Sequence, residues 1–171
     1  MHGTGLVHPS IGRAAIAAAF ITGLVHTAEP AQAVTITPSG DVVASGKLRY
    51  KKSFVTVECD TRFVAHITED GQLTVHNAEF GRNGLCRFIS ALALPWRGQA
   101  QGNHILVIHN ATVQVEFPVL GGVCGPSRLE LAWDNAQSTL TFKDALLKSP
   151  EGRDCVTNGV VSVVPPLDVK P

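Results

Sequence analysis

Residues 111–117 read Ala-Thr-Val-Gln-Val-Glu-Phe, and apolar and polar side chains alternate through this stretch. A period of two residues predicts a β-strand with one buried face. The preceding residues 104–108, His-Ile-Leu-Val-Ile, form an almost wholly apolar run that predicts another strand. His109 and Asn110 lie between the two runs and suit a two-residue turn. We therefore expect the whole region to form a β-hairpin.

Similar patterns predict two more hairpins. Residues 63–68 and the alternating residues 72–76 flank a Glu-Asp-Gly turn, and residues 129–133 and 138–142 flank a turn at 134–137. Further strands are expected at residues 54–59 and 158–164, and helical turns only at residues 88–94 or 143–148. The predicted fold class is all-β: an antiparallel β-sandwich, or a partly open barrel, of about 8–9 strands. We favour the sandwich.

The first 33 residues have the pattern of a signal peptide. Arg13 precedes a small apolar run, and Ala31-Gln32-Ala33 offers a small-x-small cleavage site. The run is shorter than the ~20 residues that cross a bilayer, so we expect no transmembrane anchor. Cleavage near Ala33 would leave residues 34–171 as a single exported domain, in the periplasm, at the cell surface or outside the cell. Its tail, residues 167–171, is expected to fray.

Composition excludes some classes of protein. Hydrophobic residues make up 44% of the chain and charged residues 16%, which is the opposite of a disordered composition. The formal net charge is zero and the pI is about 7.0, so nucleic acid is not an expected partner.

Four cysteines follow the expected cleavage site: Cys59, Cys86, Cys124 and Cys155. An even number in an exported chain predicts disulfides. Three pairings are possible, and we favour Cys59–Cys86 with Cys124–Cys155. Each such bond closes a loop of ~30 residues and contributes ~3–4 kcal/mol by chain entropy. A zinc site is the less favoured alternative, because no C-x-x-C occurs and no His lies near a Cys.

No sequence motif indicates catalysis. The serine-hydrolase elbow, the P-loop, the G-x-G-x-x-G fingerprint and the H-E-x-x-H motif are all absent from the sequence. Carboxylates occur at predicted turns and polar faces, where solvated charge explains them. His66 and His76 flank the first predicted turn, and a two-His metal or proton site is conceivable there, although exposed strand histidines are the preferred interpretation. We predict that the protein is not an enzyme and has no cofactor and no metal.

The segment around Leu94-Pro95-Trp96 is the candidate contact surface. Together with Leu92, these residues would present an apolar patch to a lipid, an alkane or a protein partner. For Trp96 itself, the preferred interpretation is that it closes one end of the sandwich as part of the core.

Several short motifs, in order, carry a resemblance to a known family. In chain order these motifs are Ile36-Thr37-Pro38-Ser39-Gly40, Leu73-Thr74-Val75-His76-Asn77-Ala78-Glu79-Phe80-Gly81, Leu94-Pro95-Trp96, Val123-Cys124-Gly125-Pro126, and Gly159 and Pro165 after Cys155. This order resembles the bacterial protein activators of alkane oxidation of the PraA/PraB type.

The resemblance implies a small secreted, non-catalytic accessory that helps disperse or present alkane alongside biosurfactant, with no catalytic residues to carry over. The expected partners are hydrophobic small molecules, biosurfactant or cell-surface components, and the oligomeric state stays open. The alternative function is an exported structural, adhesive or biofilm-matrix protein that assembles through β-strand edges. An enzyme, most plausibly a hydrolase, is the third and least favoured hypothesis.

Overall fold

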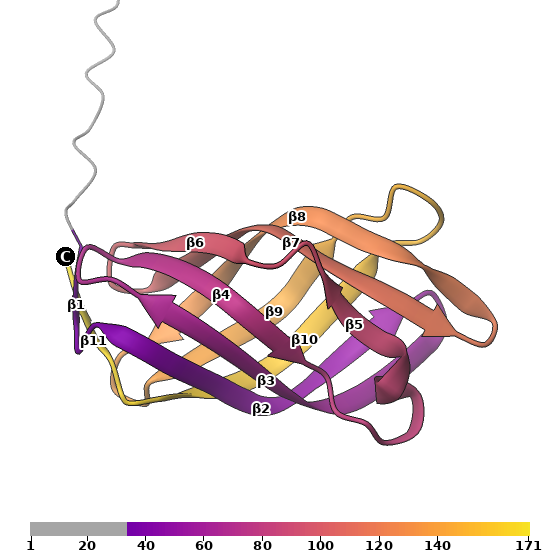
Figure 1. Cartoon of the computed structure of the whole chain (residues 1–171), viewed down its shortest axis with the longest axis horizontal. Coiled ribbons are helices and arrows are strands. Elements are labelled where there is room, and N and C mark those ends of the chain that lie inside the picture. The colour runs from indigo at the N-terminus through magenta and orange to yellow at the C-terminus, as the bar shows by residue number, and fades with distance from the viewer. Residues whose placement is uncertain (1–33) are drawn as a thin grey trace, which may run out of the picture. The chain divides into compact units, whose positions relative to one another are not determined.

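The computed structural model describes residues 34–171, so the predicted signal peptide and its cleavage site lie outside the described residues. Eleven strands and one short 3-10 helix form the described part (Figure 1). The elements are β1 (Thr35–Thr37), β2 (Gly40–Lys52), β3 (Val55–Ile67), β4 (Gln72–Glu79), η1 (Gly84–Phe88), β5 (Ile89–Leu92), β6 (Trp96–Gln101), β7 (Ile105–Phe117), β8 (Leu120–Asp134), β9 (Thr139–Leu147), β10 (Cys155–Val164) and β11 (Asp168–Lys170). Within this part of the chain, no helix is long and apolar enough to cross a membrane.

The main sheet closes on itself. Its strand order is β5-β7-β6-β4-β3-β2-β10-β9-β8, and β7 also pairs with β8, so eight strands form a closed barrel with β5 as an addition. The predicted all-β class is therefore confirmed, and the closure makes the architecture a barrel rather than the favoured sandwich. Strands as long as β8, with 15 residues, can run around such a barrel and bend where bulges interrupt them.

The predicted turn at His109 and Asn110 is wrong. Residues 105–117 form the single strand β7, with register shifts against β8 between Ile108 and Val113. Asn110 has a φ of 58°, a left-handed conformation that Asn adopts more readily than most residues. The local signal that resembled a turn is therefore an irregularity that bends one long strand.

The hairpin turns predicted at residues 69–71 and 134–137 are confirmed, because β3 connects to β4 and β8 connects to β9 there. The helical turn predicted at residues 143–148 is wrong, because β9 occupies it, and that at 88–94 coincides with η1 only at Phe88, after which β5 begins. Short apolar runs do not distinguish a helix from a buried strand by pattern alone.

The C-terminal tail is ordered, contrary to the expectation that it frays. β11 pairs with β1 in a separate two-stranded ribbon, with Ile36 opposite Val169. Ile36, Leu167 and Val169 are all buried, so apolar contacts hold this ribbon against one end of the barrel. Figure 1 shows the ribbon at the left end.

The two disulfides join Cys59 to Cys86 and Cys124 to Cys155, which confirms the favoured pairing. Cys86 belongs to η1, and its bond to Cys59 holds η1 against the first half of β3. This half of β3 does not pair with β4, because the β3–β4 pairing begins at Arg62. Cys124 and Cys155 connect β8 to β10. Neither bond joins neighbouring strands of the sheet: the first connects η1 to β3, and the second connects β8 to β10, which β9 separates.

Candidate apolar binding site

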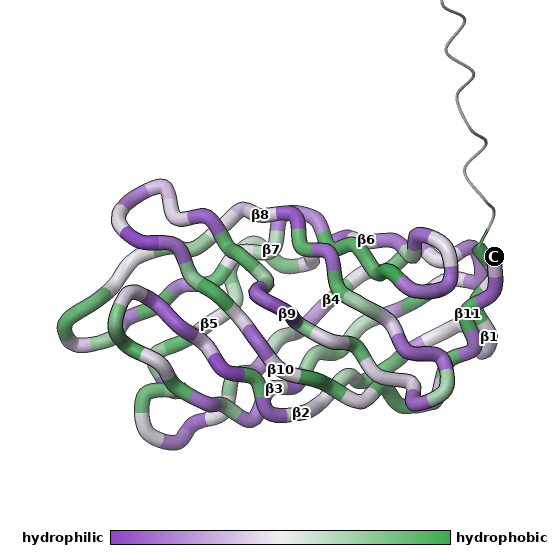
Figure 2. The backbone as a smooth tube through the Cα atoms, turned by 180° about the vertical axis from the view of Figure 1, so that it is seen from behind, coloured by the Kyte–Doolittle hydropathy of each residue, from purple (hydrophilic) through white to green (hydrophobic). Residues whose placement is uncertain are grey.

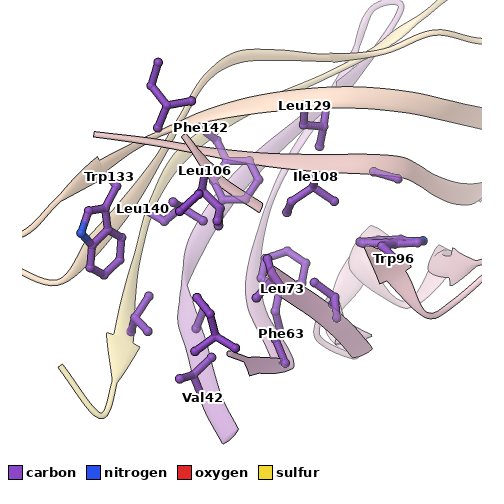
Figure 3. A pocket seen from close by; sticks show the side chains of 18 of the residues that line it. Val42, Phe63, Leu73, Trp96, Leu106, Ile108, Leu129, Trp133, Leu140 and Phe142 are labelled. Carbon is purple, nitrogen blue, oxygen red and sulfur yellow. The ribbon is translucent and has the colours of Figure 1, made fainter. Parts of the chain in front are cut away.

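The interior of the barrel contains an apolar cavity with a volume of about 90 Å³. Its lining comes from strands all around the barrel, and the side chains point inward from opposite walls (Figure 3). The labelled lining residues are Val42, Phe63, Leu73, Trp96, Leu106, Ile108, Leu129, Trp133, Leu140 and Phe142. No Asp, Glu, Lys, Arg or His side chain belongs to the lining. An apolar cavity of this kind stays dry and favours an apolar occupant.

Aromatic rings cross the middle of the interior. Phe63 stacks on Phe142 with ring centroids 6.1 Å apart, and Phe80 meets both Phe63 and Tyr50 edge to face. The Tyr50 hydroxyl shares a 2.9 Å hydrogen bond with Thr61 Oγ1. Burial raises the pKa of Tyr50, so its hydroxyl stays neutral. Rigid rings in edge and stacked contact give this wall of the cavity a defined shape.

Trp96 belongs to the lining of the cavity and does not lie on the surface. Only 4% of it is exposed, and its indole Nε1 donates a 2.8 Å hydrogen bond to the carbonyl oxygen of Leu92. The contact surface predicted from the Leu-Pro-Trp segment is thus wrong for this residue. The reason is the alternation of β6, in which Trp96 and Gly98 are buried while Arg97 between them is exposed.

The other members of the predicted surface remain at or near solvent. Pro95 is exposed, and Leu92 and Leu94 are partly buried. An apolar contact through these three residues stays a prediction, and Trp96 does not belong to it.

One end of the cavity approaches solvent beside the β6–β7 hairpin. Ile105 is the most exposed of the described residues that line the cavity, at 39%. Ala100, Asn103 and Leu106 surround it and are partly buried. We refer to these four residues as the mouth of the cavity.

The β1–β11 ribbon covers the same end of the barrel as the mouth. Asn135 fixes it, because its Oδ1 accepts the Val169 N–H at 2.8 Å and its Nδ2 donates to the Val169 oxygen at 2.8 Å. The same Oδ1 accepts the indole N–H of Trp133, which lines the cavity, at 2.7 Å. One side chain therefore couples the ribbon to the wall of the cavity.

The end of the interior opposite the mouth contains only a small void. A separate void of only about 20 Å³ remains there, with Lys52 and Phe117 among its walls. Lys52 is buried, and its Nζ donates to the Arg153 carbonyl oxygen at 2.9 Å. Burial lowers the pKa of Lys52, and the nearby Asp154 carboxylate opposes that shift. Lys52 and Phe117 thus line this small void and not the cavity itself.

The two histidines considered for a metal or proton site are not direct cross-strand partners. His66 lies opposite Thr74, not His76, and its Nδ1 is 2.8 Å from Asp41 Oδ1 in an exposed pair. Over residues 34–171 there is no group of three His, Cys, Asp or Glu side chains that could hold a metal ion.

Sequence reasoning missed the cavity altogether. The available signal was the size of the inward-facing residues, because Ala44, Ala65, Ala100 and Ala111 line the cavity with small side chains. Alanine at core positions of a barrel leaves room that larger residues would fill. Their inward direction could not be assigned without the register of the strands.

Comparison with known proteins identifies the family. The family described as alkane oxidation protein activators, PraA/PraB-like, matches residues 10–171. The match covers most of the chain, so this chain belongs to that family and the resemblance is confirmed. No curated protein matches the chain, and neither does any solved structure.

Proposed function

We propose that this protein is an exported, non-catalytic accessory of alkane oxidation that holds the apolar chain of a hydrocarbon in its barrel, and so assists hydrocarbon dispersal or uptake at an apolar interface. The observation that carries the proposal is the cavity, whose lining includes no ionisable side chain except Tyr50, which stays neutral. Hydrophobic small molecules are then its direct ligands, and biosurfactant or cell-surface components are partners of the same process.

The energetics favour an alkyl chain over a polar ligand. Each methylene transferred from water to an apolar environment gains ~0.8 kcal/mol. A carboxylate or ammonium group in the cavity would lose its hydration and find no charged partner there, which is costly. A lining of this kind also supplies no acid, base or nucleophile, which supports a role in binding rather than in turnover.

Size limits what the resting cavity accepts. At about 90 Å³ it is smaller than the apolar cavity of ~150 Å³ that admits benzene in an engineered protein. A short alkyl segment fits as the cavity stands, and a longer chain enters when the mouth or the ribbon moves outward.

The disulfides support export, because such bonds persist in oxidising compartments outside the cytoplasm. A signal peptide cleaved near Ala33 would deliver residues 34–171 to the compartment in which the protein meets hydrocarbon.

Quenching of tryptophan fluorescence by a bromoalkane tests the proposal. The chain has two tryptophans, Trp96 and Trp133, and both line the cavity. Bromine quenches indole on contact, so 1-bromohexane is expected to quench the oxidised protein saturably, and n-hexane to relieve the quenching by competition. Weak, unsaturable quenching that n-hexane leaves unchanged would refute the binding site.

A matched pair of variants locates the ligand. Ala44→Leu adds three carbons inside the cavity, whereas Ala132→Leu adds the same atoms on the exposed side of β8. Displacing about three methylenes of ligand is expected to weaken binding of 1-bromohexane by about tenfold or more in Ala44→Leu and to leave Ala132→Leu unchanged. Circular dichroism confirms that both variants are folded.

A further inference from the structure

We propose that the cavity takes a hydrocarbon with one neutral hydroxyl group, a short primary alcohol, whose oxygen forms a hydrogen bond with Thr157. This inference rests on the proposed function and deepens it, because it names a class of ligand for the same cavity. The observation that carries it is the set of polar side chains in the lining, since only one of them lacks a partner.

The polar atoms near the mouth and the walls of the cavity are satisfied. The indole N–H of Trp96 donates to the Leu92 carbonyl oxygen at 2.8 Å. The indole N–H of Trp133 donates to Asn135 Oδ1 at 2.7 Å. Asn103 belongs to the mouth and is only partly buried, so water can reach its amide. None of these groups needs a ligand.

The Tyr50 hydroxyl has a partner as well. Thr61 Oγ1 donates its hydrogen to the Cys59 carbonyl oxygen at 3.1 Å. In the 2.9 Å bond between Tyr50 and Thr61, the tyrosine must therefore be the donor. The hydrogen of the Tyr50 hydroxyl is thus already in use.

Thr157 is the polar residue of the lining that has no such partner. It lies on β10 and is 3% exposed. Within residues 34–171, no group forms a hydrogen bond with its hydroxyl, and no side-chain oxygen there is both sealed off and unpaired. The Thr157 oxygen therefore borders open space, and that space is the barrel interior, because the residue lines the cavity.

Thr157 occupies a position where the strand pattern favours an apolar residue. Figure 2 shows hydrophobic and hydrophilic residues alternating along the barrel strands, as expected when one face of each strand lies inside. Cys155 and Val161 are other buried positions of β10, and both are apolar. A hydroxyl at an inward position of this strand thus departs from the pattern that formation of the core requires.

The hydroxyl lies at the end of the cavity that is remote from the mouth. Thr157 lines both the cavity and the small void of about 20 Å³, as do Tyr50, Val113 and Leu147. The small void lies opposite the mouth, so these shared residues mark the deep end of the cavity. An alkyl chain attached to an oxygen at Thr157 would extend through the apolar lining toward the mouth.

The chemistry of the site selects an alcohol. A buried hydroxyl without a partner costs free energy, which a hydrogen bond from a ligand recovers. One water molecule is a poor occupant, because buried waters make about three hydrogen bonds and Thr157 offers the one unpaired side chain. An ionised group would find no opposite charge in the lining. A neutral hydroxyl can donate to Thr157 or accept from it, and its alkyl chain suits the remaining lining.

Competition with 1-bromohexane tests this ligand. 1-Hexanol is expected to relieve quenching in the parent. Thr157→Val keeps a similar shape and removes the hydroxyl, so it is expected to weaken binding of 1-hexanol by about tenfold and to leave binding of n-hexane unchanged. Thr141→Val makes the same change outside the lining on β9, and should change neither affinity. Equal binding of 1-hexanol by the parent and Thr157→Val would overturn the proposal.

Thermal unfolding without ligand tests the unpaired hydroxyl by itself. Thr157→Val is expected to have a Tm at least as high as that of the parent, because no hydrogen bond is lost. Thr61→Val is the matched comparison, and it should lower the Tm because the Thr61 hydroxyl bonds to Tyr50 and to the Cys59 oxygen. An equal loss in the two variants would show that Thr157 has a partner within the protein, and would overturn the proposal.

The alcohol and the proposed function fail separately. Binding of 1-bromohexane and n-hexane without binding of 1-hexanol would refute the alcohol and leave the proposed function standing. The opposite result is a Tm that 1-hexanol raises in the parent but not in Thr157→Val, with no saturable quenching by 1-bromohexane. That result would support the alcohol and refute the hydrocarbon.

Discussion

Asp154 lies at the end of the β9–β10 connection and is held in its ionised form by local hydrogen bonds. Its Oδ1 accepts the Ser149 backbone N–H at 2.9 Å, and its Oδ2 accepts Lys148 Nζ at 3.1 Å. These contacts, with the backbone N–H as the largest cause, hold the pKa of Asp154 below its ordinary value of 3.8. A carboxylate with a lowered folded-state pKa stabilises the fold above its ordinary pKa and loses that contribution as the pH falls through the folded-state value.

Replacing this carboxylate should remove part of the acid sensitivity of the fold. Asp154→Asn is expected to have a lower Tm than the parent at pH 6 and a smaller fall in Tm between about pH 5 and pH 2. Thermal unfolding followed by circular dichroism measures both, and Glu116→Gln, a change at an exposed strand position, is the control. Parallel acid profiles for the parent and Asp154→Asn would show that this contact does not contribute to the pH dependence.

The Leu94-Pro95-Trp96 segment shows how much about a residue's environment can be predicted from its identity alone. Its apolar character could be read directly, but the burial of Trp96 depends on its position opposite Val75 in the β4–β6 pairing. A shift of one residue in register would have placed the ring outside the barrel. The apolar side chain of a residue therefore predicts that it makes an apolar contact. Only the strand register determines whether that contact lies inside the barrel or on its surface.

At the scale of the secondary-structure element, Gly98 allows β6 and β7 to approach each other closely. It lies on β6 opposite Ile108 of β7, and a Cβ at this position would be 2.3 Å from the Val107 carbonyl oxygen. Backbone atoms cannot retreat as a flexible side chain can, so β6 and β7 would have to separate.

Adding one methyl group at Gly98 should therefore destabilise the barrel. Gly98→Ala is expected to lower the free energy of unfolding by about 1–3 kcal/mol. Gly121→Ala is the matched control, because the Cβ there would be 3.5 Å from the nearest atom, the Val115 oxygen, which is an ordinary contact distance. Urea unfolding measures both changes, and equal stability of the two variants would contradict the close approach of β6 and β7.

The elements were predicted best where the chain reverses direction. The Asp-Gly turn at residues 69–71 and the turn at residues 134–137 carry their own local chemistry, so these hairpins could be predicted from the sequence. β3 and β7 were each predicted as two shorter strands. Local irregularities, such as the left-handed Asn110, resemble chain reversals when neighbouring strands are not known.

At the scale of the whole molecule, the disulfide pairing could be predicted and the closed barrel could not. Loop length favoured bonds between neighbouring cysteines, and that argument needs only the sequence. Closure depends on the pairing of β7 with β8 and of β10 with β2, and the second pair joins segments more than 100 residues apart. The internal cavity exists because the sheet closes, so it could not be predicted without these long-range strand pairings either.

The sequential pairing also predicts how the two bonds act together. Cys59 and Cys86 are separated by 27 residues and Cys124 and Cys155 by 31, and the two loops do not overlap. Closing either loop therefore restricts a different part of the unfolded chain, and each contribution is ~3–4 kcal/mol in the chain-entropy model. Independent contributions to the free energy of unfolding add, whereas nested or crossed loops would not.

Removing the bonds one at a time and together tests this additivity. Cys59→Ala/Cys86→Ala and Cys124→Ala/Cys155→Ala are each expected to lower the free energy of unfolding by ~3–4 kcal/mol, and the quadruple variant by about the sum. Urea unfolding of the four proteins measures the three differences. A quadruple variant no less stable than one of the pairs would mean that the bonds share one constraint. That result would contradict a structure in which one bond holds η1 against β3 and the other connects β8 to β10.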